Sequence, residues 1–574
     1  MSQPIAWGPF RIRRLAQWRD ATRREVVGDL VAGLSVTALA VPYGMAYAQL
    51  AGVPAVNGLY TTVVAMLAYA VIGPSRVLLL GPDSALAPLI AAAVALVVSD
   101  GDPAEAVAVA GMLALMTGVI CVVVGAVRLG ALAELLSRPV QVGYLNGLAI
   151  VMVASQLGKL AGFSTDGETV PTQVDSFIQG VDAGEVNGTT LILGLGVLVT
   201  ILVLNRIVPA VPSVFVAVVG AILAVEVLDL TDRGVAVVGR IPTGFPAPAW
   251  PGVGTGDLWP LLLASIGLAW VTLTDTTALS RGFASRLGER VEPDAEIAAL
   301  GVANLAAGVF QGFPVSASTS RTSTAHATGG RTQLVGVLCA ALVLLLLVAA
   351  GGLVEHLPDT ALAAVVVVAA LHLFDLGQLS RLARVRRSEL LLCLAATAGV
   401  VFVGVLDGIV IAVFLSLANF IRRVWRPYDA VLGRVDYRRG YHDIARHPDA
   451  RLVPGLILFR FDAPLFFANA EHFARRVREV IAASDQPVRR FVVTAEPISD
   501  IDTTAAEVLV DLIAELRADG IEFGFAEMKG PVKDRMRDYG IDDIVLQRSQ
   551  PTVGRAVASY VEDHGVEWSD WSDA

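Results

Sequence analysis

The sequence predicts a polytopic α-helical membrane protein that ends in a small α/β domain. Of the 574 residues, 55% are hydrophobic and 17% are charged, whereas soluble domains carry about 25% charged residues. The mean hydropathy is +0.65. Long uncharged runs recur from about residue 28 to about residue 422 and then stop. These observations exclude a disordered chain, a disulfide scaffold and a conventional soluble enzyme.

The N-terminal segment, residues 1–27, is rich in arginine and tryptophan and precedes the first apolar run. It is too long and too basic for a cleaved signal peptide, and no small-residue cleavage site follows it. We therefore expect it to stay on the chain.

The membrane region, residues 28–426, has room for roughly twelve to fourteen spans with short loops. Residues 106–127 form one run of 22 residues without a charge. At a rise of 1.5 Å per residue such a run covers about 30 Å, which is the thickness of a bilayer core.

Loop charges select the number of spans, because arginines and acids mark alternate loops. The arginine set is Arg76, Arg128, Arg138, Arg206, Arg281, Arg286, Arg290, Arg331, Arg381, Arg384, Arg386, Arg387, Arg422, Arg423 and Arg426. The acid set is Asp100, Asp102, Asp166, Glu168, Asp175, Asp182, Glu185, Glu226, Asp229, Asp232, Glu355 and Asp359. The positive-inside rule places the arginine loops in the cytoplasm. Fourteen spans satisfy this rule for every loop and leave both termini cytoplasmic, whereas thirteen would put the last cluster outside.

The composition changes from about Pro427, where charges return and alternate with apolar residues. Strands are predicted at residues 456–459, 491–493 and 521–525, and helices at 470–483 and 503–518. This alternation is typical of a small α/β domain. The domain contains no Gly-rich phosphate loop, which argues against a transporter driven by ATP within this chain.

Two segments interrupt the apolar pattern with a Gly/Pro break, a capping residue and small residues. They are Gly81–Ser84 and Gly312–Arg321. Irregular backbone at membrane depth is tolerated only where it lines a cavity or is buried in protein. A half-helix that starts there directs unpaired N–H groups and a partial positive charge into the cavity. Paired breaks of this kind indicate an anion site in a transporter, the alternative being ordinary loops between helices.

Three ionisable residues accompany these breaks. Asp275 lies in an otherwise neutral span, and an intramembrane acid is a functional hypothesis by default. Arg321 follows the second break by about one turn and either adds positive charge to the cavity or anchors the helix at its cytoplasmic end. The negative charge of Asp83 would disfavour a bound anion. Asp83 is therefore interpreted as a helix cap rather than as a proton or cation ligand. For Asp275 the alternative is a structural buried acid.

The two halves share a spacing of 41 residues, from Tyr43 to Ser84 and from Asp275 to Ser316. Two repeats of seven spans, at about residues 28–228 and 257–426, would be inverted relative to each other because seven is odd.

Several strings together resemble the sulfate permease (SulP) family of anion transporters, to which pendrin and prestin also belong. They are residues 28–34 (GDLVAGL), 42–48 (PYGMAYA), 52–54 (GVP), 58–60 (GLY), 137–140 (SRPV), 155–157 (SQL), 301–321 and 331–334 (RTQL). The resemblance covers nearly the whole chain and is closest to actinobacterial sulfate permease-like proteins.

The resemblance implies fourteen spans in two inverted repeats, divided into a core and a gate domain, and a homodimer. It also implies a cytoplasmic STAS domain at about residues 435–565, which leaves a tail at 566–574. Substrate would bind between the N-termini of the third and tenth spans. The candidate binding residues are Tyr43, Tyr47, Asp83, Ser84, Ala85, Ser316, Ala317, Ser318, Ser320 and Arg321.

This sequence departs from the family pattern at two positions. Tyr43 stands where relatives carry Gln, which bears on substrate size and hydrogen bonding. Asp275 stands where the family usually has Glu. Some relatives that take up bicarbonate with sodium also have Asp at this position.

In the STAS-like domain, Thr503 and Thr504 match a site whose hydroxyl is phosphorylated in soluble relatives. The alternative is that this position is a plain helix cap.

The sequence therefore predicts secondary transport of a small oxyanion, sulfate or bicarbonate, by alternating access at the plasma membrane. Asp275 would couple transport to a proton or a sodium ion. We expect no enzyme activity, no cofactor, no bound metal and no nucleic-acid partner; the chain has a net charge of −10. A regulator of the STAS domain would be a further partner. The alternatives are an uncoupled channel or exchanger for chloride or dicarboxylate, a nucleobase transporter of the same architecture, and a membrane anchor for a signalling domain.

Overall fold

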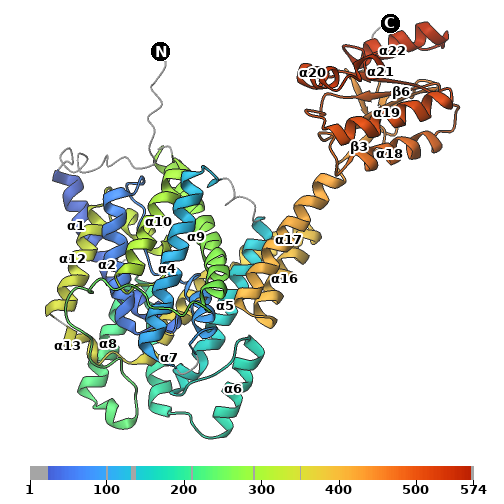
Figure 1. The fold of residues 1–574 in the computed structure, drawn as a ribbon. Helices are drawn as coiled ribbons and strands as arrows, with labels where there is room; N and C mark the ends of the chain where they lie inside the picture. The colour runs from blue at the N-terminus through green and yellow to red at the C-terminus, as the bar shows by residue number, and fades with distance from the viewer. Residues whose placement is uncertain are drawn as a thin grey trace. The chain divides into compact units, whose positions relative to one another are not determined.

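The computed structural model describes residues 23–98, 101–130, 137–208, 211–288, 291–349 and 351–569 (Figure 1). Residues 1–22 of the predicted N-terminal segment, Asp100, Arg290 and the tail from residue 570 lie outside these ranges. The chain divides into two compact units, Met1–Ser416 and Leu417–Ala574, which we call the membrane unit and the C-terminal unit.

The membrane unit is built from helices and two very short strands. Its first half contains α1 (Arg23–Leu50), α2 (Ala55–Ile72), β1 (Leu80–Gly81), α3 (Ala87–Ala95), α4 (Pro103–Ala126), α5 (Arg138–Ala161), α6 (Val170–Asp182), α7 (Gly188–Ile207), α8 (Ser213–Val227) and the 3-10 turn η2 (Leu230–Arg233). Its second half contains α9 (Leu258–Leu287), α10 (Pro293–Val309), β2 (Ser316–Ala317), α11 (Thr319–Ala327), α12 (Leu334–Ala349), α13 (Gly351–Glu355), α14 (Asp359–Leu373), α15 (Leu376–Val385), α16 (Arg387–Phe402) and α17 (Val405–Trp425), which continues into the C-terminal unit.

The predicted class of polytopic helical membrane protein is confirmed. Within the described residues, eight helices are long and apolar enough to cross a bilayer, and α8 and α12 are shorter apolar helices. Adding α10, α16 and the two strand-helix segments β1–α3 and β2–α11 would give the fourteen segments that the loop charges predict. The count of fourteen itself stays a prediction.

The helices pack as two copies of one pattern. The contact between α4 and α10 has a counterpart between α12 and α2. In the same way, the contact between α7 and α14 corresponds to that between α16 and α5. The contact between α1 and α12 corresponds to that between α9 and α4. These reciprocal pairs follow if α1–α5, α7 and α8 correspond in order to α9–α12, α14, α16 and α17. An inverted repeat produces this arrangement.

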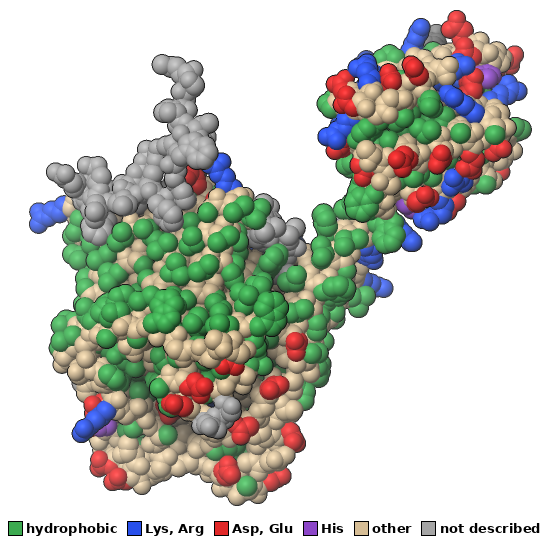
Figure 2. Space-filling view, viewed as in Figure 1, with side chains coloured by type: hydrophobic (Ala, Val, Ile, Leu, Met, Phe, Trp, Pro, Cys, Tyr) green, Lys and Arg blue, Asp and Glu red, His purple; other side chains and the backbone are tan. Residues whose placement is uncertain are grey.

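The outer surface of the membrane unit has the polarity that lipid requires. Figure 2 shows a broad band of hydrophobic side chains across it, with Asp and Glu side chains gathered toward the lower end of that unit. Helix α7 illustrates the band, because Ile192 and Val199 are exposed although both are strongly apolar. The predicted acid loops around α6 and η2 are exposed, as expected for a solvent-facing end.

The C-terminal unit contains a five-stranded mixed sheet in the order β4-β3-β5-β6-β7. The strands are β3 (Asp429–Arg434), β4 (Tyr441–Asp443), β5 (Leu456–Phe461), β6 (Arg490–Thr494) and β7 (Glu522–Ala526). Strands β5, β6 and β7 are parallel, whereas β3 is antiparallel to both of its neighbours. The helices are α18 (Ala470–Ala482), α19 (Thr503–Ala518), α20 (Gly530–Asp538), α21 (Asp542–Val545) and α22 (Val553–His564). The predicted strands and helices of this domain are confirmed, with α19 at its predicted bounds.

Helices cover both faces of this sheet. Side chains of α18, α19 and α20 form one apolar core with one face, and side chains of α22 form a second core with the other face. At the edge of the second core, the buried Arg490 pairs with Glu522 and with Asp563, at 2.7 Å from the latter. The hydrogen bond from Arg490 lowers the pKa of Asp563.

Candidate functional site

The two broken segments meet in the middle of the membrane unit through a short antiparallel ladder. Strand β1 pairs with β2 so that Leu80 lies opposite Ala317 and Gly81 opposite Ser316. The amide of Ser318 extends the ladder by donating to the Leu79 carbonyl at 3.0 Å. All of these residues are buried. The pairing is the reason that two helices from opposite repeats begin beside each other.

The first half-helix starts with a turn that Asp83 caps. Its carboxylate accepts a hydrogen bond from the Ala85 amide at 3.0 Å, and its carbonyl accepts from the amides of Leu86 and Ala87. Regular helix α3 follows from Ala87. The Ala85 amide is therefore already engaged by Asp83, while Asp83 and Ser84 remain partly exposed. The interpretation of Asp83 as a cap agrees with this geometry.

The second half-helix is capped by Ser318. Its hydroxyl accepts from the Arg321 amide at 3.5 Å and lies 3.3 Å from the hydroxyl of Ser320. Ser316 and Ala317 belong to the strand before the helix, and Ser320 is exposed on the first turn. We call strands β1 and β2, together with the first turns of α3 and α11, the cradle.

The hydroxyl of Ser316 is available to a ligand in the cradle. Its side chain is 0% exposed. Its oxygen has no hydrogen-bond partner within the part of the chain that the structure describes. Buried hydroxyls are normally hydrogen-bonded, so an unpartnered one between two helix N-termini fits a site that a polar ligand completes.

Buried amide and hydroxyl groups hold the strand of the second segment in place. Asn304 on α10 bonds the Val315 backbone twice, through its oxygen at 2.8 Å and its nitrogen at 3.1 Å. Thr276 on α9 accepts from the Ala317 amide, and Thr322 accepts from the Leu79 amide. These residues were not predicted from the sequence. Polar side chains within apolar helices are the signal that points to them.

Arg321 joins the two segments. It is 1% exposed, and its Nη2 donates to the Pro82 carbonyl at 2.5 Å. A Cβ at Gly81 would lie 3.1 Å from both terminal nitrogens of Arg321, and Gly81 has a φ of 156°. The guanidinium thus occupies the space that the missing side chain of Gly81 leaves. It contributes positive charge to the cradle from beneath β1, with Asp83 close enough to offset it.

Two tyrosines of α1 border the cradle. The rings of Tyr43 and Tyr47 are stacked with centroids 5.5 Å apart, and both side chains are 7% exposed. Helix α1 packs on both α3 and α11. The side chain of Tyr47 lies near that of Ser84. The structure therefore brings the predicted tyrosines to the same place as the predicted half-helices.

Asp275 also lies at the cradle, on α9, which packs on β2 and α3. Its carboxylate is partly exposed and accepts from Gln141 of α5 at 3.5 Å. It is near enough to Asp83 to interact electrostatically with it. Gln141 was not identified from the sequence, although it is a polar residue inside an apolar span.

The repeat register differs from the one that the 41-residue spacing suggested. A two-fold axis that relates β1 to β2 passes through their ladder, so the mate of Leu80 lies at or beside Ala317. The mate of Ser84 is then close to Ser320 rather than Ser316. The equal spacings from Tyr43 and from Asp275 therefore do not mark equivalent positions.

The predicted regulatory hydroxyls lie at the start of α19 in the C-terminal unit. Asp502 caps the helix by accepting from the Ala505 amide at 2.8 Å, and Thr503 and Thr504 are exposed on the first turn. The capping role thus belongs to Asp502, and both threonine hydroxyls are open to solvent.

Comparison with known protein families matches residues 26–396 to the Sulfate permease family and residues 447–556 to the STAS domain. A probable sulfate transporter of Mycobacterium tuberculosis is 44% identical over 537 residues, which cover 94% of this chain and 95% of the relative. A probable sulfate transporter of Arabidopsis thaliana is 29% identical and covers 90% of this chain and 78% of the relative.

Two solved structures share the fold. The murine solute carrier 26 family member A9 anion transporter, in its inward-facing state, superposes with a TM-score of 0.87 at 22% identity, covering 96% of this chain and 94% of that one. The transmembrane domain of a cyanobacterial bicarbonate transporter superposes with a TM-score of 0.60 at 23% identity, covering 68% and 98%. With the paired broken helices in place, these matches show that the chain belongs to the sulfate permease family and carries a C-terminal STAS domain.

Proposed function

We propose that this chain is a secondary active transporter of a small inorganic oxyanion, with sulfate the first candidate and bicarbonate the second. The cradle is the observation that carries the proposal, because it pairs the segments that lead into two half-helices and leaves the buried Ser316 hydroxyl unpartnered. The names of the relatives support sulfate, and that of the cyanobacterial structure supports bicarbonate.

Transport would proceed by alternating access. The cradle lies within the segments α1–α4 and α9–α12, which would form the core, while α5–α8 and α14–α17 would form the gate. Gln141 of the gate bonds Asp275 of the core across their boundary. A sliding movement of the core against the gate would break such bonds and carry the anion between the two faces of the membrane.

Asp275 would couple the anion to a proton or a sodium ion. An ionised carboxylate beside the cradle repels an anion, and a bound proton or sodium ion removes that repulsion. Anion and cation would therefore each increase the affinity for the other, as reciprocal linkage requires.

The remaining assignments follow from the charge pattern and the family. We place the protein in the plasma membrane with cytoplasmic termini, since the arginine loops then lie inside. A homodimer and a cytoplasmic regulator that contacts Thr503 or Thr504 are further proposals. A phosphate at these hydroxyls would be stabilised by the N-terminus of α19.

The test is uptake by the purified full chain in liposomes. Labelled sulfate, bicarbonate, chloride, a dicarboxylate and uracil would be offered under imposed proton or sodium gradients. We expect gradient-dependent accumulation of an oxyanion. Equilibration without accumulation at channel-like rates would favour an uncoupled channel, and uptake of uracil would favour a nucleobase transporter. Absence of uptake of every probe by folded protein would refute the transport proposal.

A further inference from the structure

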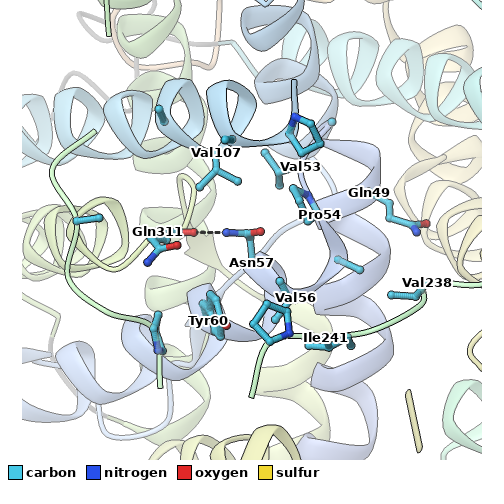
Figure 3. Close-up of a pocket in the computed structure, with 18 of the residues that line it drawn as sticks. Gln49, Val53, Pro54, Val56, Asn57, Tyr60, Val107, Val238, Ile241 and Gln311 are labelled. Carbon is cyan, nitrogen blue, oxygen red and sulfur yellow. Dashed lines mark hydrogen bonds between the residues drawn. The ribbon is translucent and has the colours of Figure 1, made fainter. Parts of the chain in front are cut away.

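A cavity of about 1000 Å³ lies in the membrane unit at the end that bears the acid loops. The last turns of α1, α5 and α10 and the first turns of α2, α4 and α14 surround it, and the connection through residues 237–251 completes its wall. Figure 3 shows part of this wall, with Gln49 near the end of α1, Val53 in the turn before α2, and Val238 and Ile241 on the connection. By the loop charges, this is the outer end.

Two cationic side chains and one acid line this cavity. Lys159 lies in the last turn of α5 and is the only lysine of the membrane unit, since the other two lysines of the chain are Lys529 and Lys533. Arg240 belongs to the connection and is exposed. Neither makes a hydrogen bond or an ion pair of contact distance with any residue that the structure describes. Asp359 is the acid.

The cavity keeps a positive balance, because two cations face one acid. Gln49 of α1 donates its side-chain N–H to the Asp359 carboxylate at 2.6 Å. Asp359 also lies near enough to Lys159 to interact with it electrostatically. Even if Asp359 fully compensates the charge of Lys159, the charge of Arg240 remains.

The sign of this charge is opposite to that of the surrounding surface. Apart from Arg233, the charged residues in the nearby loops of α6 and η2 are all exposed acids. Helix dipoles do not explain the difference, because three helix N-termini and three helix C-termini border the cavity and their fields offset one another. The side chains of Lys159 and Arg240 therefore set its potential.

The floor of the cavity connects to the cradle through the chain itself. Asn57 of α2 donates its side-chain N–H to the Gln311 carbonyl at 2.7 Å, as the dashed line in Figure 3 shows. Gln311 begins the segment that leads into β2, and Thr61, one turn further along α2, accepts from the Phe313 amide. An anion in the cavity would thus lie close to the backbone that leads into the second half of the cradle.

We propose that this cavity is an outer capture site, in which Lys159 and Arg240 concentrate a small divalent oxyanion before it reaches the cradle. The proposal rests on the proposed function and adds to it a second, outward-facing anion site. A cleft of one charge sign raises the local concentration and the association rate of an oppositely charged ligand, and salt screens this effect.

Uptake of labelled sulfate into intact cells that express the full chain tests the outer face. We expect Lys159→Gln and Arg240→Gln each to raise the KM about three- to ten-fold with little change in the maximal rate, as loss of electrostatic steering implies. The difference from the unmodified chain should shrink at high ionic strength. Lys159→Arg should keep the KM, and Asp359→Asn should lower it, an effect that a folding defect would not produce.

Arg233→Gln is the matched control, because this arginine is exposed in η2 on the same side and does not line the cavity. Everted vesicles sample the inner face, where all of these variants should match the unmodified chain. An unchanged KM in both cavity variants, or a change seen only in everted vesicles, would overturn the capture site. The unmodified chain can fail to take up sulfate from either face and still take up another anion; the same comparison is then made with that anion. If no probe is taken up, the transport proposal itself is refuted.

Discussion

Arg321 shows how one buried cation can organise the site at the scale of a single residue. Its guanidinium bonds the Pro82 carbonyl and fills the space beside Gly81, so the second half-helix holds the first in position. Burial of a charge is costly unless it is hydrogen-bonded and compensated. The Pro82 carbonyl bonds Nη2 and nearby Asp83 offsets part of the charge, whereas Nε and Nη1 have no hydrogen-bond partner among the described residues. Arg321 is thus as much a positioning residue as a source of charge.

Substitution of Gly81 tests this packing without changing a charge. Gly81→Ala would place a Cβ 3.1 Å from the guanidinium nitrogens at a φ of 156°, which residues with side chains rarely adopt. We expect sulfate uptake to fall at least about ten-fold, since a displacement of about 1 Å at a site costs far more than its size suggests. Gly282→Ala on α9, which meets no atom within 4 Å, should leave uptake intact.

Asp275 provides the test of coupling. Asp275→Asn keeps the size of the side chain and can still bond Gln141, but it takes up no proton and has no negative charge to attract a sodium ion. We expect loss of gradient-driven uptake, measured in liposomes, while the protein elutes as before from a size-exclusion column. Asp257→Asn, at the start of the same helix, should retain the uptake. Unchanged proton and sodium dependence in Asp275→Asn would contradict the coupling role.

At the scale of elements, glycines allow α4 and α10 to approach closely. A Cβ at Gly118 would lie 2.8 Å from the Gly301 carbonyl oxygen, and one at Gly308 would lie 2.6 Å from that of Gly111. These pairs recur at seven-residue intervals, which returns to the same helix face after two turns. Small residues take this role in membrane proteins, where close backbone contact replaces the hydrophobic effect.

Gly118→Val tests this contact. Its side chain would collide with the α10 backbone and force the two helices apart, at a cost of about 1–3 kcal/mol if the packing relaxes. We expect a lower midpoint of thermal unfolding in detergent and lower yield. Gly196→Val on α7 introduces the same side chain where no atom lies within 4 Å, so its unfolding midpoint should stay near that of the unmodified chain.

At the scale of the whole molecule, each unit has its own apolar core, and none of the cradle residues comes from the C-terminal unit. We therefore expect a chain truncated after Arg426 to retain sulfate uptake per molecule of folded protein in liposomes. Folded but inactive truncated protein would show instead that the STAS domain takes part in the transport cycle. Uptake absent from both the truncated and the full chain would favour the membrane-anchor hypothesis.

The sequence predicted much of the candidate site because the breaks in the helices are local. Gly81–Pro82 and Gly312–Pro314 interrupt apolar runs, and the caps Asp83 and Ser318 are recognisable beside them. It did not predict Asn304, Thr276 or Gln141, whose partners are distant in sequence. Their roles depend on which helix faces meet, and a polar residue in an apolar span does not by itself name its partner.

The sequence by itself determined the membrane class, the broken helices, the family and the α/β domain. Each of these depends on composition, on short-range backbone chemistry or on motif strings. The tertiary structure decided the pairing of β1 with β2, the register that makes Ser320 rather than Ser316 the mate of Ser84, and the burial of Arg321 against Gly81. It also placed Lys159, Arg240 and Asp359 around one cavity. The physical reason is that contacts between segments hundreds of residues apart depend on how the two repeats pack against each other, and no local pattern encodes that geometry.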